Sequence, residues 1–165
     1  MSAPQAMTGR VTLGNGEIKD LASPGRRLVA RIIDVVILVV VLLIAIGVGI
    51  AGALVGDDES GLAALAVFGG LVMWFVLALL YEVTLIALRG QTLGKMAMGI
   101  MVARAEDGGV PGWSKAIGRW ILPGLLNLIP FVGGFLGLLV YLSLLWDDRR
   151  QGWHDKMGTT VVINA

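Results

Sequence analysis

Residues 35–55 read VVILVVVLLIAIGVGIAGALV, a run of 21 residues without a charged side chain. A helix that crosses a bilayer needs about 20 mainly apolar residues, so this run predicts a membrane-spanning helix. A second apolar run, from Leu62 to Leu88, contains only one charged residue, Glu82. We therefore expect an all-α integral membrane protein built on two long transmembrane helices, with the lipid bilayer as its main partner.

The composition of the chain agrees with a membrane location. Of its 165 residues, 56% are hydrophobic and only 15% are charged, whereas soluble domains carry about 25% charged residues. Because the sequence has no cysteine, disulfides, thiol catalysis and thiolate metal sites are excluded. Thirteen basic and 12 acidic residues give a net charge of +1, which gives no support to nucleic-acid binding.

The third apolar stretch, from Trp120 to Trp146, is uncharged but is interrupted by Pro130. Proline removes a backbone donor and disfavours helix in the preceding residue. We predict a shorter helical hairpin, Gly112–Ile129 and Phe131–Trp146, broken at Pro130. In the alternative, Gly112–Ile129 lies on the membrane surface as an amphipathic helix and only Phe131–Trp146 crosses.

The distribution of charge predicts the orientation. All Lys and Arg residues fall within 10–31, 89–119 and 149–156, whereas the loop at 56–61 carries three acidic residues, Asp57, Asp58 and Glu59. Basic loops stay in the cytoplasm, so we expect a multi-pass plasma-membrane protein with both termini cytoplasmic. This orientation requires an even number of crossings after residue 89, which favours the hairpin.

Segments outside the spans predict a tail and a small strand pair. Residues 1–25 are polar, contain several Gly and Pro residues and lack the apolar core of a signal peptide, so we expect a flexible cytoplasmic tail before a membrane domain at 26–165. Gly99–Arg104 and Thr159–Asn164 have the β-branched and apolar composition of strands. Because isolated strands are marginal in water, we expect these two to pair at the cytoplasmic surface.

Charged residues at the start of the first span predict an ion pair. Arg27, Arg31 and Asp34 are spaced i, i+4 and i+7, so they share one helix face. A carboxylate at this depth is costly unless it is paired. We therefore predict that Asp34 pairs with Arg27 or Arg31.

A second carboxylate, Glu82, lies seven residues before Arg89, just as Asp34 lies seven residues after Arg27. Since the two helices run in opposite directions, both carboxylates should lie at a similar depth, where Arg119 could also reach them. This predicts a polar cluster of seven candidate site residues, which are Arg27, Arg31, Asp34, Glu82, Arg119, His154 and Asp155. The cluster is either a functional site or a satisfied network that fixes the helix register.

Other motifs allow fewer conclusions. His154 is the only histidine, which excludes a multi-histidine metal site, and with Asp155 it forms either a proton relay or a turn that ends the last helix. Gly90–Lys95 has the wrong spacing for a phosphate-binding loop, so we interpret it as a tight turn and expect no cofactor or metal. Small residues suit close helix packing within the chain or in a homo-oligomer; they are Ala45, Gly49 and Ala53, with the pairs Gly52/Gly56 and Gly133/Gly137.

Three motifs in order resemble the RDD family of small bacterial membrane proteins, which is named for one arginine and two aspartates. The first has Arg27, Ala30 and Asp34, and the second runs through Gly90-Gln-Thr-Leu-Gly-Lys95 to Gly99. The third, Arg149-Arg-Gln-Gly-Trp-His-Asp155, offers Asp155 as the second aspartate. The resemblance covers about Arg26 to Ile163, and Arg31 departs from the apolar residue expected at that position.

The resemblance implies transport of unidentified ions or solutes, with no established enzymatic activity. Our first hypothesis is a transporter or exchanger that uses Asp34 and Glu82. The second is a non-transporting adaptor or assembly protein with a cytoplasmic docking face. We expect no enzyme, because Ser143 has no obvious partner in the sequence.

Overall fold

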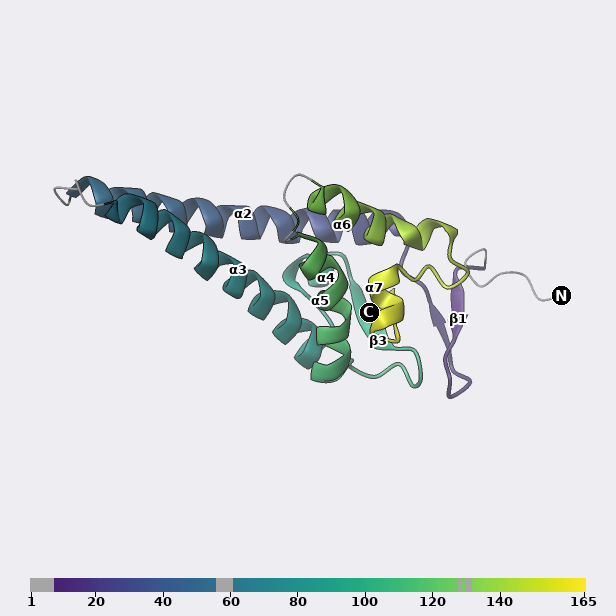
Figure 1. The fold of residues 1–165 in the computed structure, drawn as a ribbon. Coiled ribbons are helices and arrows are strands. Elements are labelled where there is room, and N and C mark those ends of the chain that lie inside the picture. Colours follow the sequence, from purple (N-terminus) through teal and green to yellow (C-terminus); the bar gives the residue numbers. More distant parts are fainter. Residues whose placement is uncertain (1–7, 56–60, 128, 130–131) are drawn as a thin grey trace.

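Two long helices dominate the computed structural model, which describes residues 8–55, 61–127, 129 and 132–165. Helix α2 comprises Pro24–Val55 (32 residues) and α3 comprises Leu62–Arg89 (28 residues). They lie close together at the far tip and diverge toward the rest of the chain (Figure 1). Both predicted long helices are therefore present.

The surface of these two helices is apolar and exposed. Leu43, Val48, Leu65 and Phe68 each expose 63–69% of their surface, and no residue of the most apolar window of α2 is buried. At 1.5 Å per residue α2 is about 48 Å long, longer than the ~30 Å hydrocarbon core of a bilayer. A large exposed apolar surface of this kind is typical of a membrane-facing helix, and the first turns of α2 can extend beyond the hydrocarbon.

A small two-stranded sheet lies at the open end of the two helices. Strand β3 (Ile100–Arg104) pairs antiparallel with β4 (Thr160–Asn164), with Val102 opposite Val162. The predicted pairing of these segments is therefore present. One face of the sheet packs on α2 and α3 through Ile100, Val102 and Val162, which join a core with Ala30 and Ile86.

The other face of this sheet is covered by an N-terminal hairpin, which differs from the predicted flexible tail. Strands β1 (Arg10–Thr12) and β2 (Ile18–Asp20) pair antiparallel, and Leu21 continues onto Ile163. Val11, Leu13 and Leu21 are at most 4% exposed and pack on the sheet. The prediction of a flexible tail is thus wrong from residue 8 onward, because these apolar side chains gain a partner only in the folded protein. Residues 1–7 lie outside the described part.

The remaining helices are short. They are α4 (Leu93–Ala97), α5 (Gly112–Asn127), α6 (Gly133–Leu142) with the 3₁₀ turn η1 (Ser143–Trp146), and α7 (Trp153–Met157). The predicted break at Pro130 falls outside the described residues. Helix α5 is about 24 Å long and α6 together with η1 is about 23 Å long, so each is shorter than the ~30 Å hydrocarbon core of a bilayer. Only α2 and α3 have the length and apolar composition of a span among the described residues.

Candidate functional site: a buried charged cluster at the open end of the long helices

One face of α2 directs three charged side chains to three different elements. Arg27 contacts Asp155 in α7, Arg31 contacts Glu82 in α3, and Asp34 contacts the start of α4. The i, i+4, i+7 spacing therefore does place these residues on one side of the helix. It does not pair them with one another.

Asp34 is held by hydrogen bonds rather than by an arginine. Its side chain is 1% exposed and accepts from the Tyr81 hydroxyl (2.8 Å), the Thr92 hydroxyl (2.6 Å) and the Gly94 amide (2.8 Å). The predicted pairing of Asp34 with Arg27 or Arg31 is therefore wrong. The physical reason is tertiary: α4 brings a backbone N–H and a hydroxyl to the carboxylate, while each arginine finds a carboxylate on another element.

The glycines of the Gly90–Lys95 motif allow this close approach. A Cβ on Gly94 would lie 2.1 Å from the Ala30 carbonyl oxygen of α2. Gly90 ends α3 with a φ of 68°, and a Cβ there would lie 2.5 Å from the Val102 carbonyl oxygen. Only glycine fits at both positions. The motif thus seats α4 between α2 and β3, a more specific role than the predicted tight turn.

Arg31 and Glu82 form a half-buried ion pair between the two long helices. Their N–O distance is 3.1 Å, and their side chains are 31% and 22% exposed. The Arg31 guanidinium also lies 4.8 Å from the centre of the Tyr141 ring, a cation–π contact. Glu82 therefore joins the predicted cluster, with Arg31 as its partner.

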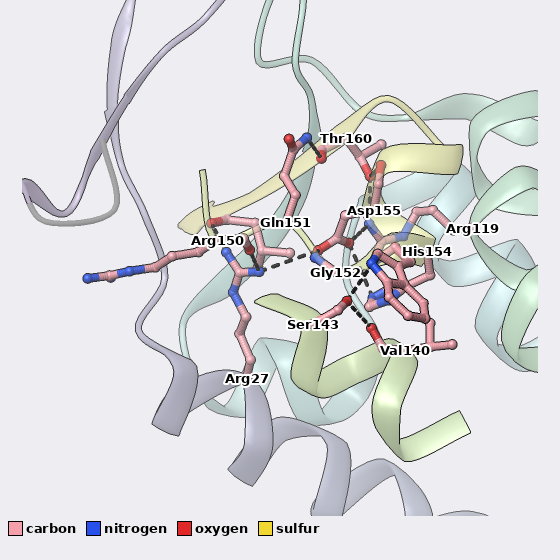
Figure 2. Close-up of polar contacts among 12 residues, drawn as sticks. Arg27, Arg119, Val140, Ser143, Arg150, Gln151, Gly152, His154, Asp155 and Thr160 are labelled. Atoms are coloured by element: carbon pink, nitrogen blue, oxygen red, sulfur yellow. Dashed lines mark hydrogen bonds and ion pairs between the residues drawn. The ribbon is translucent and has the colours of Figure 1, made fainter. Parts of the chain in front are cut away.

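Asp155 is the centre of the most buried charged group. Its carboxylate, 1% exposed, lies between Arg27 and Arg119, with Arg27 Nη1 at 3.4 Å and Arg119 in direct contact (Figure 2). The Gly152 amide also donates to it at 3.1 Å. Burial alone would raise the pKa of Asp155, but Arg119, His154 and Arg27 together hold it well below its ordinary value. The carboxylate is therefore ionised.

Arg27 and Arg119 also donate hydrogen bonds to groups other than Asp155. Arg27 donates to the carbonyl oxygens of Arg150 and Val162, at 2.5 Å and 3.0 Å, and Arg119 donates to the Thr160 hydroxyl at 2.5 Å. Helices α2, α5 and α7 and strand β4 are thereby linked through one ionic centre. Arg119 therefore lies at this ionic centre beside Asp155, and not beside Asp34.

His154 is buried next to Asp155. Its Nε2 lies 3.3 Å from the Asp155 carboxylate, and its ring packs on Tyr141 with a centroid separation of 4.6 Å. Burial lowers the pKa of His154 to about 4; the Asp155 charge opposes this shift and Arg119 adds to it. The imidazole is thus neutral at pH 7, and its Nδ1 has no hydrogen-bond partner among the described residues.

This pKa predicts how stability depends on pH. The folded-state pKa of His154 is about 4, against 6.5 in the unfolded chain. The unfolded state therefore binds the proton first as the pH falls. The stabilisation is complete above about pH 6.5 and is lost between pH 6.5 and about 4, with a total near 3 kcal/mol.

The measurement is thermal unfolding of the purified protein in detergent at several pH values between 7 and 4.5. Because His154 is the only histidine of the chain, His154→Gln should flatten the pH dependence in this range. The pKa of the imidazole also depends on the charges of Glu82, Lys95, Arg119 and Asp155. None of these groups is a histidine, so His154→Gln removes the only histidine titration. A wild-type melting temperature that stays constant down to pH 4.5 would contradict the assignment.

The Ser143 side chain is fixed by two hydrogen bonds. Its hydroxyl donates to the Val140 carbonyl at 2.7 Å and accepts from the Trp153 amide at 2.9 Å (Figure 2). These bonds join the end of α6 to the start of α7.

Two cavities share the Arg31–Glu82 pair in their walls. The larger, of about 420 Å³, lies between α2, α3 and α5, with mainly apolar walls such as Leu38 and Phe75. The smaller, of about 40 Å³, is lined by charged groups. Both cavities are lined by Arg31, Glu82 and Tyr141.

The small cavity brings together six of the seven predicted cluster residues; they are Arg27, Arg31, Glu82, Arg119, His154 and Asp155. Asp34 is the exception. Sequence reasoning missed Tyr81, Thr92, Lys95 and Tyr141. Thr92 carried a local signal, because a threonine before a short apolar segment is a typical helix N-cap, and it does cap α4 through Lys95.

These features define a helical membrane protein in which a buried ionic cluster joins the long helices to a small sheet. The model of the RDD family matches residues 21–159, and the chain belongs to this family. No curated protein and no solved structure matches the chain.

Proposed function

We propose that this RDD family protein moves a small ion or solute across the membrane, and that the Arg31–Glu82 pair contacts the solute during passage. One observation carries the proposal: the same ion pair lines both the apolar cavity and the small charged cavity. Ionisable groups within membrane segments commonly mark solute or ion pathways. We propose a non-enzymatic role.

The geometry of the pair supports this role. Both side chains keep about a quarter of their surface exposed, so the pair can open at a lower desolvation cost than a fully buried one. By contrast, Asp34 has three fixed donors. Of the two carboxylates predicted to take part in transport, Glu82 is therefore the better candidate. Asp34 instead holds the start of α4 against α2.

An arrangement with both termini in the cytoplasm fits this proposal. Helices α2 and α3 would cross and return, and the basic segments at their open end would face inside. Helices α5 and α6 are in contact, and both also contact α7, which contacts strand β4 (Figure 1). Since both are short, we propose that they enter the bilayer from the cytoplasmic side and return, in place of the predicted crossing hairpin.

Cysteine labelling tests the orientation. The natural chain has no cysteine, so single cysteines can be introduced at Ser60 and Ala165. An impermeant maleimide applied to intact cells should label Ser60→Cys, whereas Ala165→Cys should react only after the membrane is opened. Labelling of Ala165→Cys from outside would contradict the proposed arrangement.

Flux in proteoliposomes tests transport. Separate vesicles should carry gradients of Na⁺, K⁺, H⁺ or Cl⁻, each followed with an ion-selective dye or electrode. Wild-type protein should dissipate at least one gradient faster than empty vesicles. Glu82→Gln should reduce that rate by at least about tenfold, because Arg31 would then face the cavity unpaired. Glu106→Gln is the matched control, since Glu106 pairs with Lys115 at the surface and should keep the wild-type rate.

Wild-type protein that moves none of these ions would contradict ion transport and favour the adaptor hypothesis. Equal rates for Glu82→Gln and the control would remove Glu82 from the pathway. Assembly of several copies through Ala45, Gly49 and Ala53 stays a prediction, which the size of the purified protein in detergent can test.

A further inference from the structure

The small charged cavity carries an excess of positive charge. Four cations line it, Arg27, Arg31, Lys95 and Arg119, against two carboxylates, Glu82 and Asp155. With all four basic groups protonated and His154 neutral, four minus two leaves two positive charges. Asp34 lies behind the Thr92 hydroxyl, and that hydroxyl contacts Lys95. If Asp34 is counted as well, one positive charge remains.

Such an excess is costly where water is scarce. Buried charges are normally paired, because removing an ion from water costs several kcal/mol that only a counter-charge can offset. Arg119 and Asp155 expose 8% and 1% of their side chains, and Arg27 exposes 9%. The residues that define the cavity therefore lack part of their counter-charge.

Two basic side chains at the cavity have few acceptors among the described residues. The Nε of Arg27 has no hydrogen-bond partner among the described residues. Lys95 has three N–H donors, and its ammonium contacts the Thr92 hydroxyl at 3.3 Å. Burial lowers the pKa of Lys95; the charges of Arg119 and Arg31 add to this effect, while Glu82 and Asp34 oppose it.

We propose that this cavity binds one small monovalent anion of about the size of chloride, held by Arg27, Lys95 and Arg119. The cavity volume of about 40 Å³ leaves room for a small ion, because one water molecule needs about 10–15 Å³ of space measured in this way. A water molecule is the competing occupant, because it can donate to Nδ1 of His154, which has no hydrogen-bond partner in the described part of the chain.

The inference concerns the cavity of the proposed function, but it does not depend on transport. Binding is therefore measured on the purified full-length protein in detergent, without a membrane gradient. Thermal unfolding is followed in sodium chloride, sodium bromide and sodium gluconate at equal ionic strength, and the ³⁵Cl line width is measured by NMR. Chloride and bromide should raise the melting temperature saturably over gluconate, and bromide should reverse the broadening of the ³⁵Cl line.

A matched pair of lysine variants locates the site. Lys95→Gln should raise the half-saturating chloride concentration by about tenfold or more. Lys115→Gln removes the same charge from the surface pair with Glu106 and should bind chloride as wild type does. Lys95→Arg, which keeps the charge, should retain binding. The melting temperatures in gluconate show whether each variant is folded.

Equal melting temperatures in chloride and gluconate, with no ³⁵Cl broadening, would overturn the proposal and leave water as the occupant. Chloride binding that Lys95→Gln and Lys115→Gln weaken equally would place the anion elsewhere. Anion binding without flux would contradict only the proposed transport. Flux without chloride dependence of stability would contradict only the anion site.

Discussion

Asp155→Asn should destabilise the protein by about 3–5 kcal/mol, the usual cost of removing one partner from a buried ion pair. Asn is nearly the same size, so the change removes the charge and little else. Arg27 and Arg119, which expose 9% and 8% of their side chains, would then face one another without their shared carboxylate. We expect low yield from membranes and a large drop in melting temperature in detergent.

Asp107→Asn is the matched control. Asp107 also pairs with an arginine, Arg104, but the two side chains are 47% and 37% exposed. Exposed pairs contribute little to stability, so this variant should melt close to wild type. A further variant, Arg27→Gln with Asp155→Asn, should recover part of the loss because one of the two unpaired charges is also removed. Equal melting temperatures for Asp155→Asn and Asp107→Asn would show that the buried centre is not needed for stability.

Asp34→Ala should be nearly as damaging, with an expected cost of about 3 kcal/mol or more. The change leaves the donors of Tyr81, Thr92 and Gly94 without their acceptor, and each buried donor left unsatisfied costs about 1–3 kcal/mol. The two hydroxyls can rotate toward other acceptors, but the Gly94 amide is fixed by the backbone. Thermal unfolding and yield are again the measurements.

A double variant distinguishes hydrogen bonding from ion pairing at Asp34. If Asp34 were the partner of Arg31, removing both charges would restore stability. The structure pairs Arg31 with Glu82 at 3.1 Å, so Arg31→Gln with Asp34→Ala should be less stable than Asp34→Ala alone. Partial rescue by the double change would contradict the hydrogen-bonded arrangement.

Gly94→Ala tests the same contact from the other side. Its Cβ would overlap the Ala30 carbonyl oxygen and lie 2.9 Å from the Asp34 carboxylate, so α4 would have to move away from α2. Gly69→Ala is the control, since no atom lies within 4 Å of the added Cβ and alanine is a better helix former than glycine. The first variant should melt well below wild type and the second at or above it.

The sequence by itself determined the membrane class, the two long helices, the family and six of the residues that line the charged cavity. These follow from local properties: apolar length decides whether a helix can cross a bilayer, and charged residues in apolar segments stand out because they are costly there. The strand segments at 99–104 and 159–164 were also predictable, since their composition is local.

Only the tertiary structure decided which charges pair. Helical spacing placed Arg27, Arg31 and Asp34 on one face, but their partners are 128, 51 and 58 residues away in the chain, at Asp155, Glu82 and Thr92. The N-terminal hairpin was missed for the same reason, because Val11 and Leu21 are buried only against β3 and β4. The sequence indicates which charged and apolar side chains need a partner. Which partner satisfies it depends on the elements that packing brings within about 3 Å, and that packing arises only when the whole chain has folded.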